Sequence, residues 1–113
     1  MSLTVERASL FTADFERQFA WYVDKAGAQV AWRFQVALDN SLSRLAEQPE
    51  IGRMRRFAHP KLRSLRSYQV GRPFNKLLIF YRAEGGVLQA LRLMHGARDL
   101  PRRLAQPPGS LAD

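Results

Sequence analysis

The stretch LLIFYRAEGGVLQALRLMHGARDL, residues 77–100, decides the fold of this chain. Residues 77–82 are apolar and rich in aromatic and branched side chains, which is typical of a buried strand. Gly85 and Gly86 follow in a short turn, where glycine tolerates positive φ. A second apolar run, residues 87–95, then returns as the partner strand. The stretch therefore predicts a β-hairpin.

Strict alternation along this hairpin predicts two apolar faces. In the second strand it places Leu91 and Leu93 on one side and Arg92 and Met94 on the other. Helices packed on one face leave the other partly exposed, so we expect a terminal segment or a partner protein to cover it. An arginine among leucines is costly without a partner, and we expect Arg92 to anchor a neighbouring carboxylate or carbonyl rather than touch a substrate.

The residues before the hairpin predict one strand, two helices and a further strand. Residues 3–8 alternate as a short strand. From Thr12 the apolar spacing becomes helical, with Thr12 or Asp14 as the expected cap and Gly27 as the end. A second apolar stripe runs from Val30 and ends before Pro49, and residues 61–70 read as a strand with a bulge or bend. The order strand–helix–helix–strand–strand–strand predicts an α+β fold, with a helical hairpin on one face of an antiparallel sheet.

Length and composition limit the class of protein. The chain has 113 residues, enough for one small domain, which we place at residues 1–105, with a flexible tail at 106–113. It contains no cysteine and only two histidines, so we expect neither a disulfide nor a metal site, and no motif predicts a cofactor. We find no signal peptide and no apolar run of membrane-spanning length, and therefore expect a soluble cytoplasmic protein that does not engage a membrane.

Charge is divided unevenly along the chain. Residues 1–50 hold five Lys/Arg and seven Asp/Glu, a balance of −2. Residues 51–103 hold thirteen Lys/Arg against Glu84 and Asp99, a balance of +11. This asymmetry predicts an anionic partner for the half of the chain that contains the hairpin.

Three segments of the chain resemble the ParE-type toxins of the RelE/ParE toxin–antitoxin superfamily. FYR (residues 80–82) followed by RLMHGARD (residues 92–99) is similar to the specific C-terminal signature of that family. LAEQPEIGR (residues 45–53) resembles its exit from the second helix, and LRSYQVGRPFNKLLIFY (residues 65–81) its approach to the central strand. The resemblance implies a βααβββ fold, with the helical hairpin on a twisted, mainly antiparallel sheet.

The resemblance also implies partners. It implies a cognate antitoxin whose acidic C-terminal tail wraps the toxin in a hetero-oligomer, and DNA gyrase as the target that the toxin poisons. A disordered acidic segment can fold onto a strongly basic region, because opposite charges attract. We expect antitoxin or target contacts from six residues of the basic half: Arg63, Arg66, Arg82, Arg92, His95 and Arg98.

The relatives that cleave mRNA in the ribosome offer an alternative function. That chemistry needs a proton acceptor, a proton donor and cations on the phosphate, for which His95, Arg63, Arg82 and Arg92 are the candidates. The basic half has one glutamate, Glu84 in the turn, and no tyrosine follows His95, so this set is incomplete. We therefore favour a gyrase poison without catalytic residues over an endoribonuclease, and a non-toxic homologue that only binds antitoxin stays open.

Overall fold

The computed structural model describes residues 2–56 and 64–96. Along the chain the elements are β1 (Thr4–Arg7), α1 (Ser9–Ala26), α2 (Ala28–Glu47), β2 (Arg53–Met54), β3 (Arg66–Gln69), β4 (Leu77–Glu84) and β5 (Val87–His95). The predicted α+β order is confirmed, and β2 is an additional short strand that was not predicted. The tail predicted at 106–113 lies outside the described residues.

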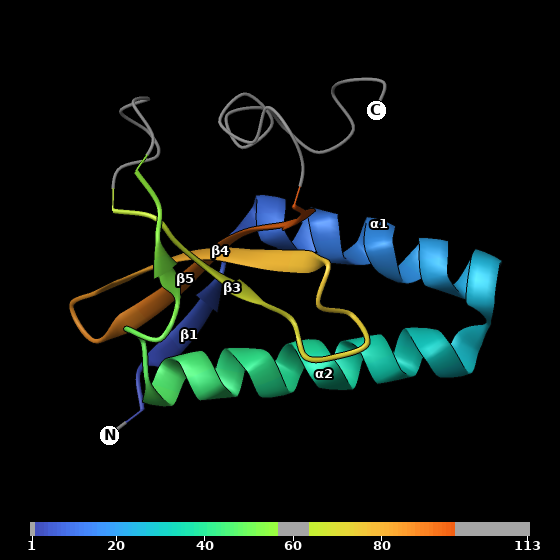
Figure 1. The fold of residues 1–113 in the computed structure, drawn as a ribbon, viewed down its shortest axis with the longest axis horizontal. Helices are drawn as coiled ribbons and strands as arrows, with labels where there is room; N and C mark the ends of the chain where they lie inside the picture. The colour runs from blue at the N-terminus through green and yellow to red at the C-terminus, as the bar shows by residue number, and fades with distance from the viewer. Residues whose placement is uncertain (1, 57–63, 97–113) are drawn as a thin grey trace.

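The two helices form the predicted antiparallel hairpin (Figure 1). Gly27 separates them with a φ of 96°, a conformation that glycine adopts without a side-chain clash. The start of α1 was predicted wrongly: the helix begins at Ser9, after Ala8, and no side chain caps it. Thr12 and Asp14 therefore lie within the helix, and Asp14 is buried because it has a partner on the sheet.

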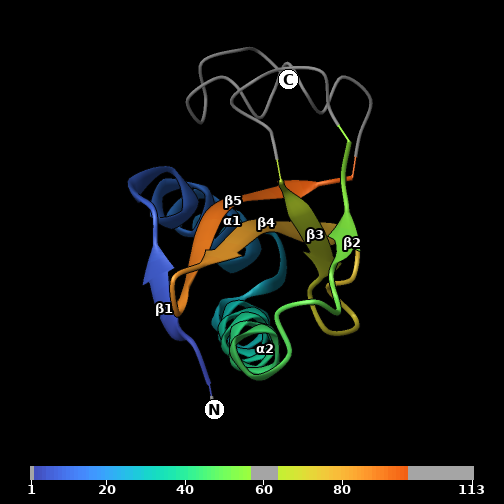
Figure 2. The same ribbon diagram turned by 90° about the vertical axis from the view of Figure 1, so that its left-hand side faces the viewer.

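The five strands form one mixed sheet in the order β1-β5-β4-β3-β2 (Figure 2). β1 pairs with β5 in parallel, whereas the other neighbours are antiparallel. The long hairpin of β4 and β5 thus lies inside the sheet, as the apolar character of both strands predicted. The helical hairpin covers one face of this sheet (Figures 1 and 2).

A β-bulge interrupts the pairing of β4 with β5. Phe80 lies opposite Arg92, but the next residue, Tyr81, lies opposite Ala90, which leaves Leu91 as an extra residue in β5. Strict alternation along β5 is therefore wrong: Leu91 packs on one side of the sheet and Leu93 on the other. The extra residue shifts the phase of side chains by one position, and residue types alone do not reveal such a shift.

Apolar side chains are buried on both faces of the sheet. The main core joins the helices to β4 and β5 through residues that include Phe11, Phe34, Leu38, Phe74, Ile79 and Tyr81. On the opposite face Leu65, Leu78 and Phe80 form a smaller cluster with Leu91 and Met94. We expected this second face to be partly exposed, but Phe80 at its centre is fully buried. Leu91 and Met94 are only partly buried, so this face is covered at Phe80 and partly exposed beside it.

The exposed apolar side chains lie elsewhere. Trp21 and Trp32 are 53% and 60% exposed on the helical hairpin. Ile51 and Met54 are 39% and 44% exposed at the β2 edge of the sheet. Over residues 2–56 and 64–96, neither helix is long and apolar enough to cross a membrane.

Candidate partner-binding site

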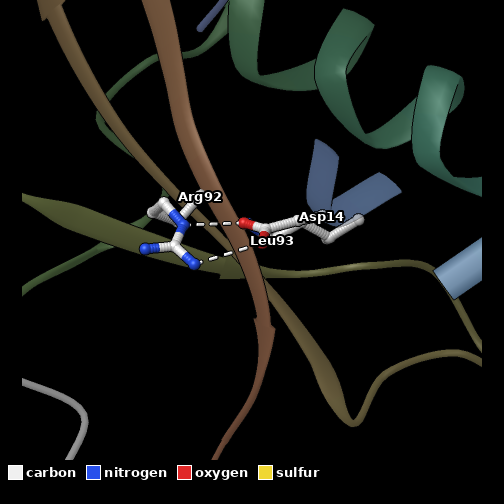
Figure 3. A network of polar contacts seen from close by, with 3 residues as sticks. All are labelled: Asp14, Arg92 and Leu93. Carbon is white, nitrogen blue, oxygen red and sulfur yellow. Dashed lines mark hydrogen bonds and ion pairs between the residues drawn. The ribbon is translucent and has the colours of Figure 1, made fainter. Parts of the chain in front are cut away.

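A buried ion pair joins the start of the chain to its last strand. Arg92 of β5 donates from Nε to Oδ2 of Asp14 at 2.8 Å, and from Nη2 to Oδ1 at 3.1 Å (Figure 3). The backbone N–H of Leu93 donates to the same Oδ2 at 2.9 Å. The Asp14 carboxylate therefore accepts two hydrogen bonds from the guanidinium and one from a strand amide, and a buried charge requires such partners.

The position of this pair follows from where β1 ends. β1 accompanies β5 only as far as Ala90, whose carbonyl accepts the N–H of Ala8. The chain then turns into α1, and Asp14 lies one turn of helix further on. Its carboxylate meets β5 where no β1 residue pairs with it. The predicted role of Arg92 as an anchor for a carboxylate is confirmed. Arg92 is only 5% exposed, so its side chain is not available to a partner at the surface.

A second network holds the connection between α2 and β2. The hydroxyl of Tyr81 donates to the Pro49 carbonyl at 2.7 Å and accepts the Gly52 N–H at 3.0 Å. Nη1 of Arg66 donates to the carbonyls of Glu50 at 3.2 Å and Gly52 at 3.0 Å. Burial raises the pKa of Tyr81, although the Gly52 hydrogen bond and the Arg66 charge oppose the shift. Arg66, predicted as a binding residue, is thus also a structural clamp.

Gly52 has no room for a side chain in this network. A Cβ there would overlap the Tyr81 hydroxyl and lie 2.6 Å from Tyr81 Cε1. The packing explains the Pro-x-x-Gly spacing of Pro49 and Gly52 in physical terms: Tyr81 bonds both residues and touches the second. The connection is therefore held in one position, from which β2 leaves toward β3.

β2 presents a different kind of side chain on each of its two faces. Arg53 lies opposite Ser67, which lies opposite Phe80, so these three share the face turned away from the helices. Arg55 follows on the same side, where its Nε donates to Ser67 Oγ at 2.7 Å. Burial, with a contribution from Arg53, lowers the pKa of Arg55. Met54 lies opposite Arg66 on the other face.

The structure does not gather the described site residues on one face of the sheet: Arg66 lies on the face that holds Met54. Arg82 is half-buried and lies two residues beyond Phe80 on β4, so its side chain belongs to the face that holds Arg53. His95 is exposed at the end of β5, opposite Leu77. Arg63 and Arg98 lie outside the described residues.

Three residues of these networks were missed at the sequence level. Arg53 and Arg55 occur in IGRMRR, residues 51–56, where no strand was predicted. Their spacing on either side of Met54 is the alternation of a strand, and this was the available signal. Nothing local identified Asp14 as a partner of Arg92. Within residues 2–56 and 64–96, no three His, Asp or Glu side chains gather as metal ligands.

The fold is similar to that of a bacterial toxin–antitoxin protein. A solved structure described as the chromosomal ParDE TA system from P. aeruginosa matches with a TM-score of 0.67 and 18% sequence identity. The match covers 83% of this chain and 96% of that one. None of the curated protein sequences is similar enough to this chain to count as a relative. At this low identity, the structural likeness shows a shared α+β architecture.

Comparison with sequence families identifies the class more closely. The profile of the ParE toxin of type II toxin–antitoxin systems, parDE, matches residues 5–100. This chain therefore belongs to the ParE toxin family. The match extends from β1 to the end of the HGARDL motif, so it includes both helices, the basic edge strand and the central hairpin.

Proposed function

We propose that this protein is the toxin of a type II toxin–antitoxin system, and that it binds DNA gyrase in the cytoplasm and blocks replication. In the resting cell a cognate antitoxin with an acidic C-terminal tail neutralises it in a hetero-oligomer. Family membership supports the general role, and the balance of +11 over residues 51–103 supports an acidic partner.

The observation that carries the choice of a poison over a nuclease is the pairing of Arg92 with Asp14. An endoribonuclease would need this arginine on the phosphate, together with Arg82, Arg63 and His95. Arg92 instead directs two nitrogens at a buried carboxylate. Moving it to a substrate would leave Asp14 as an unpaired buried charge, which costs several kcal/mol. A binder that acts through surface contacts has no such requirement.

For the binding surface we propose Arg66, Arg82 and His95, with Arg63 and Arg98. Arg82 and His95 extend from the central strands, and Arg66 reaches the β2 edge through its clamp on residues 50 and 52. Arginine suits this role because its guanidinium binds carboxylates in a bidentate manner. An acidic tail that neutralises these side chains would also block their access to a target.

Supercoiling assays with purified gyrase test the proposal. The protein is expected to inhibit supercoiling and to trap cleaved DNA, and prior mixing with the antitoxin encoded beside its gene is expected to abolish both effects. Programmed ribosomes provide the matched alternative: mRNA cleavage that His95→Ala or Arg82→Ala abolishes would identify a nuclease. If induced expression leaves growth unchanged while antitoxin still binds, the protein is a non-toxic homologue.

A further inference from the structure

The outer edge of β2 has backbone groups directed away from the sheet. β2 is the last strand in the sheet order, and none of the described residues pairs with its outer side. Toward β3, the N–H of Arg55 donates to the Leu65 carbonyl at 2.8 Å. Because N–H and C=O groups of successive strand residues point in opposite directions, those of Met54 point outward. This edge can therefore accept a hydrogen-bonded strand.

Charged and apolar side chains alternate along this edge. Arg53 is exposed on the face of the sheet that is turned away from the helices, and Arg55 is half-buried on the same face. Met54, 44% exposed, lies on the opposite face beside Arg66, and Ile51, 39% exposed, lies just before the strand. The surface is thus cationic on one side of the strand and mainly apolar on the other.

This combination distinguishes an acidic peptide from a nucleic acid. Residues 49–56 contain three arginines (Arg53, Arg55 and Arg56) and one acid, Glu50, so an anionic partner is favoured electrostatically. Phosphates would use the arginines but leave Ile51, Met54 and the outward backbone groups without contacts. An extended peptide uses all three features, because its side chains alternate with the same period of two.

We propose that an extended segment of the antitoxin, in which acidic residues alternate with apolar ones, adds to Arg53–Met54 as a further strand of the sheet. Its carboxylates bind the face with Arg53 and Arg55, and its apolar side chains cover Met54 and Ile51. This inference rests on the proposed function, since the segment belongs to the antitoxin, and it assigns that partner to one edge of the toxin.

The test uses the full toxin and the full antitoxin encoded beside its gene. Met54→Pro removes an N–H that points outward, so no hydrogen bond to β3 is lost. Proline is tolerated at such an exposed strand edge. Met54→Ala keeps that N–H and removes only apolar contact. Arg53→Glu reverses an exposed charge on β2, and Arg33→Glu makes the same change on the exposed surface of α2. Thermal unfolding of the free variants establishes that each one folds.

Isothermal titration calorimetry measures the affinities. We expect Met54→Pro and Arg53→Glu to raise the Kd for antitoxin at least about tenfold, which corresponds to about 1.4 kcal/mol. Met54→Ala is expected to raise the Kd about threefold, and Arg33→Glu to change it less than about twofold. Hydrogen exchange gives a second readout: the Met54 amide is expected to become protected on binding, whereas the Arg55 amide, bonded to Leu65, is protected in both states.

Different failures have different meanings. Wild-type affinity for Met54→Pro, together with a Met54 amide that stays unprotected in the complex, overturns strand addition at this edge and leaves the proposed function intact. If the wild-type toxin binds no antitoxin, the proposed function fails together with the edge. If Arg53→Glu weakens binding to a DNA duplex of about 20 base pairs but leaves antitoxin affinity unchanged, the arginines serve nucleic acid and the inference is wrong.

Discussion

Asp14 in the first helix and Arg92 in the last strand are 78 positions apart in sequence, yet they form a bidentate ion pair at 2.8 and 3.1 Å. Both side chains are almost fully buried, and Asp14 also accepts the Leu93 N–H. The pair lies beside the β-bulge of β5, since Arg92 directly follows the extra residue Leu91. It therefore fixes α1 against β5 at the point where regular strand pairing is interrupted.

Asp14→Ala is expected to destabilise the fold strongly. The change leaves a buried guanidinium without its carboxylate and removes the acceptor of the Leu93 N–H, a combination that typically costs about 3–5 kcal/mol. Urea unfolding followed by circular dichroism measures this loss. The double variant Asp14→Leu/Arg92→Leu should be more stable than Asp14→Ala, because it buries no unpaired charge. Equal stability of Asp14→Ala and wild type would show that the pair contributes nothing.

Tyr81→Phe is expected to lower the free energy of unfolding by about 1–3 kcal/mol. The ring stays in the core, but the Pro49 carbonyl and the buried Gly52 N–H both lose their partner. Tyr68→Phe is the matched control, because Tyr68 lies two residues from Arg66 on β3 and is only partly buried. A Tyr81→Phe protein as stable as this control would contradict the role assigned to the hydroxyl.

Stability at alkaline pH should report the burial of Tyr81. Its pKa in the fold is raised above the ordinary value of 10.0, so the unfolded chain releases this proton at lower pH than the folded chain. The contribution of Tyr81 is therefore complete below about pH 10 and is lost as pH rises through the folded pKa. Urea unfolding between about pH 8 and 11 should show a shallower decline for Tyr81→Phe than for wild type. Tyr22, whose pKa burial also raises, still contributes in both proteins. Parallel declines in the two proteins would contradict the shift.

Alanine at Gly27 and at Gly52 should destabilise the protein for different reasons. Gly27 has open space around it but a φ of 96°, so Gly27→Ala is expected to cost about 1–3 kcal/mol of backbone strain. Gly52→Ala instead forces the Tyr81 ring to move, and it should also disturb the hydrogen bonds to Pro49 and Gly52. Combining Gly52→Ala with Tyr81→Phe should cost less than the sum of the two single changes, because both act on the same contact. Simple additivity would argue against that contact.

Local patterns predicted most of the fold. The apolar stripes that begin at Phe15 and Val30 mark helices because a helix buries every third or fourth residue, and Gly27 separates them as expected. The strands at residues 77–84 and 87–95 were recognisable from their continuous apolar runs, because a strand between two neighbours needs apolar residues on both faces. The start of α1 was placed at least four residues late, with Thr12 or Asp14 in place of Ala8 as the cap, because no capping side chain marks the observed start.

The candidate site was less accessible from residue types. Arg66, Arg82 and Arg92 looked alike as arginines near strands, but Arg66 clamps a connection and Arg92 is buried against Asp14. Their roles depend on sheet register and on the bulge at Leu91, which are properties of paired strands. The sequence by itself determined the two helices, the central hairpin and the concentration of basic charge after residue 50, because these depend on neighbouring residues. Only the tertiary structure decided which cations are buried and which reach the surface, because segments distant in sequence supply their partners.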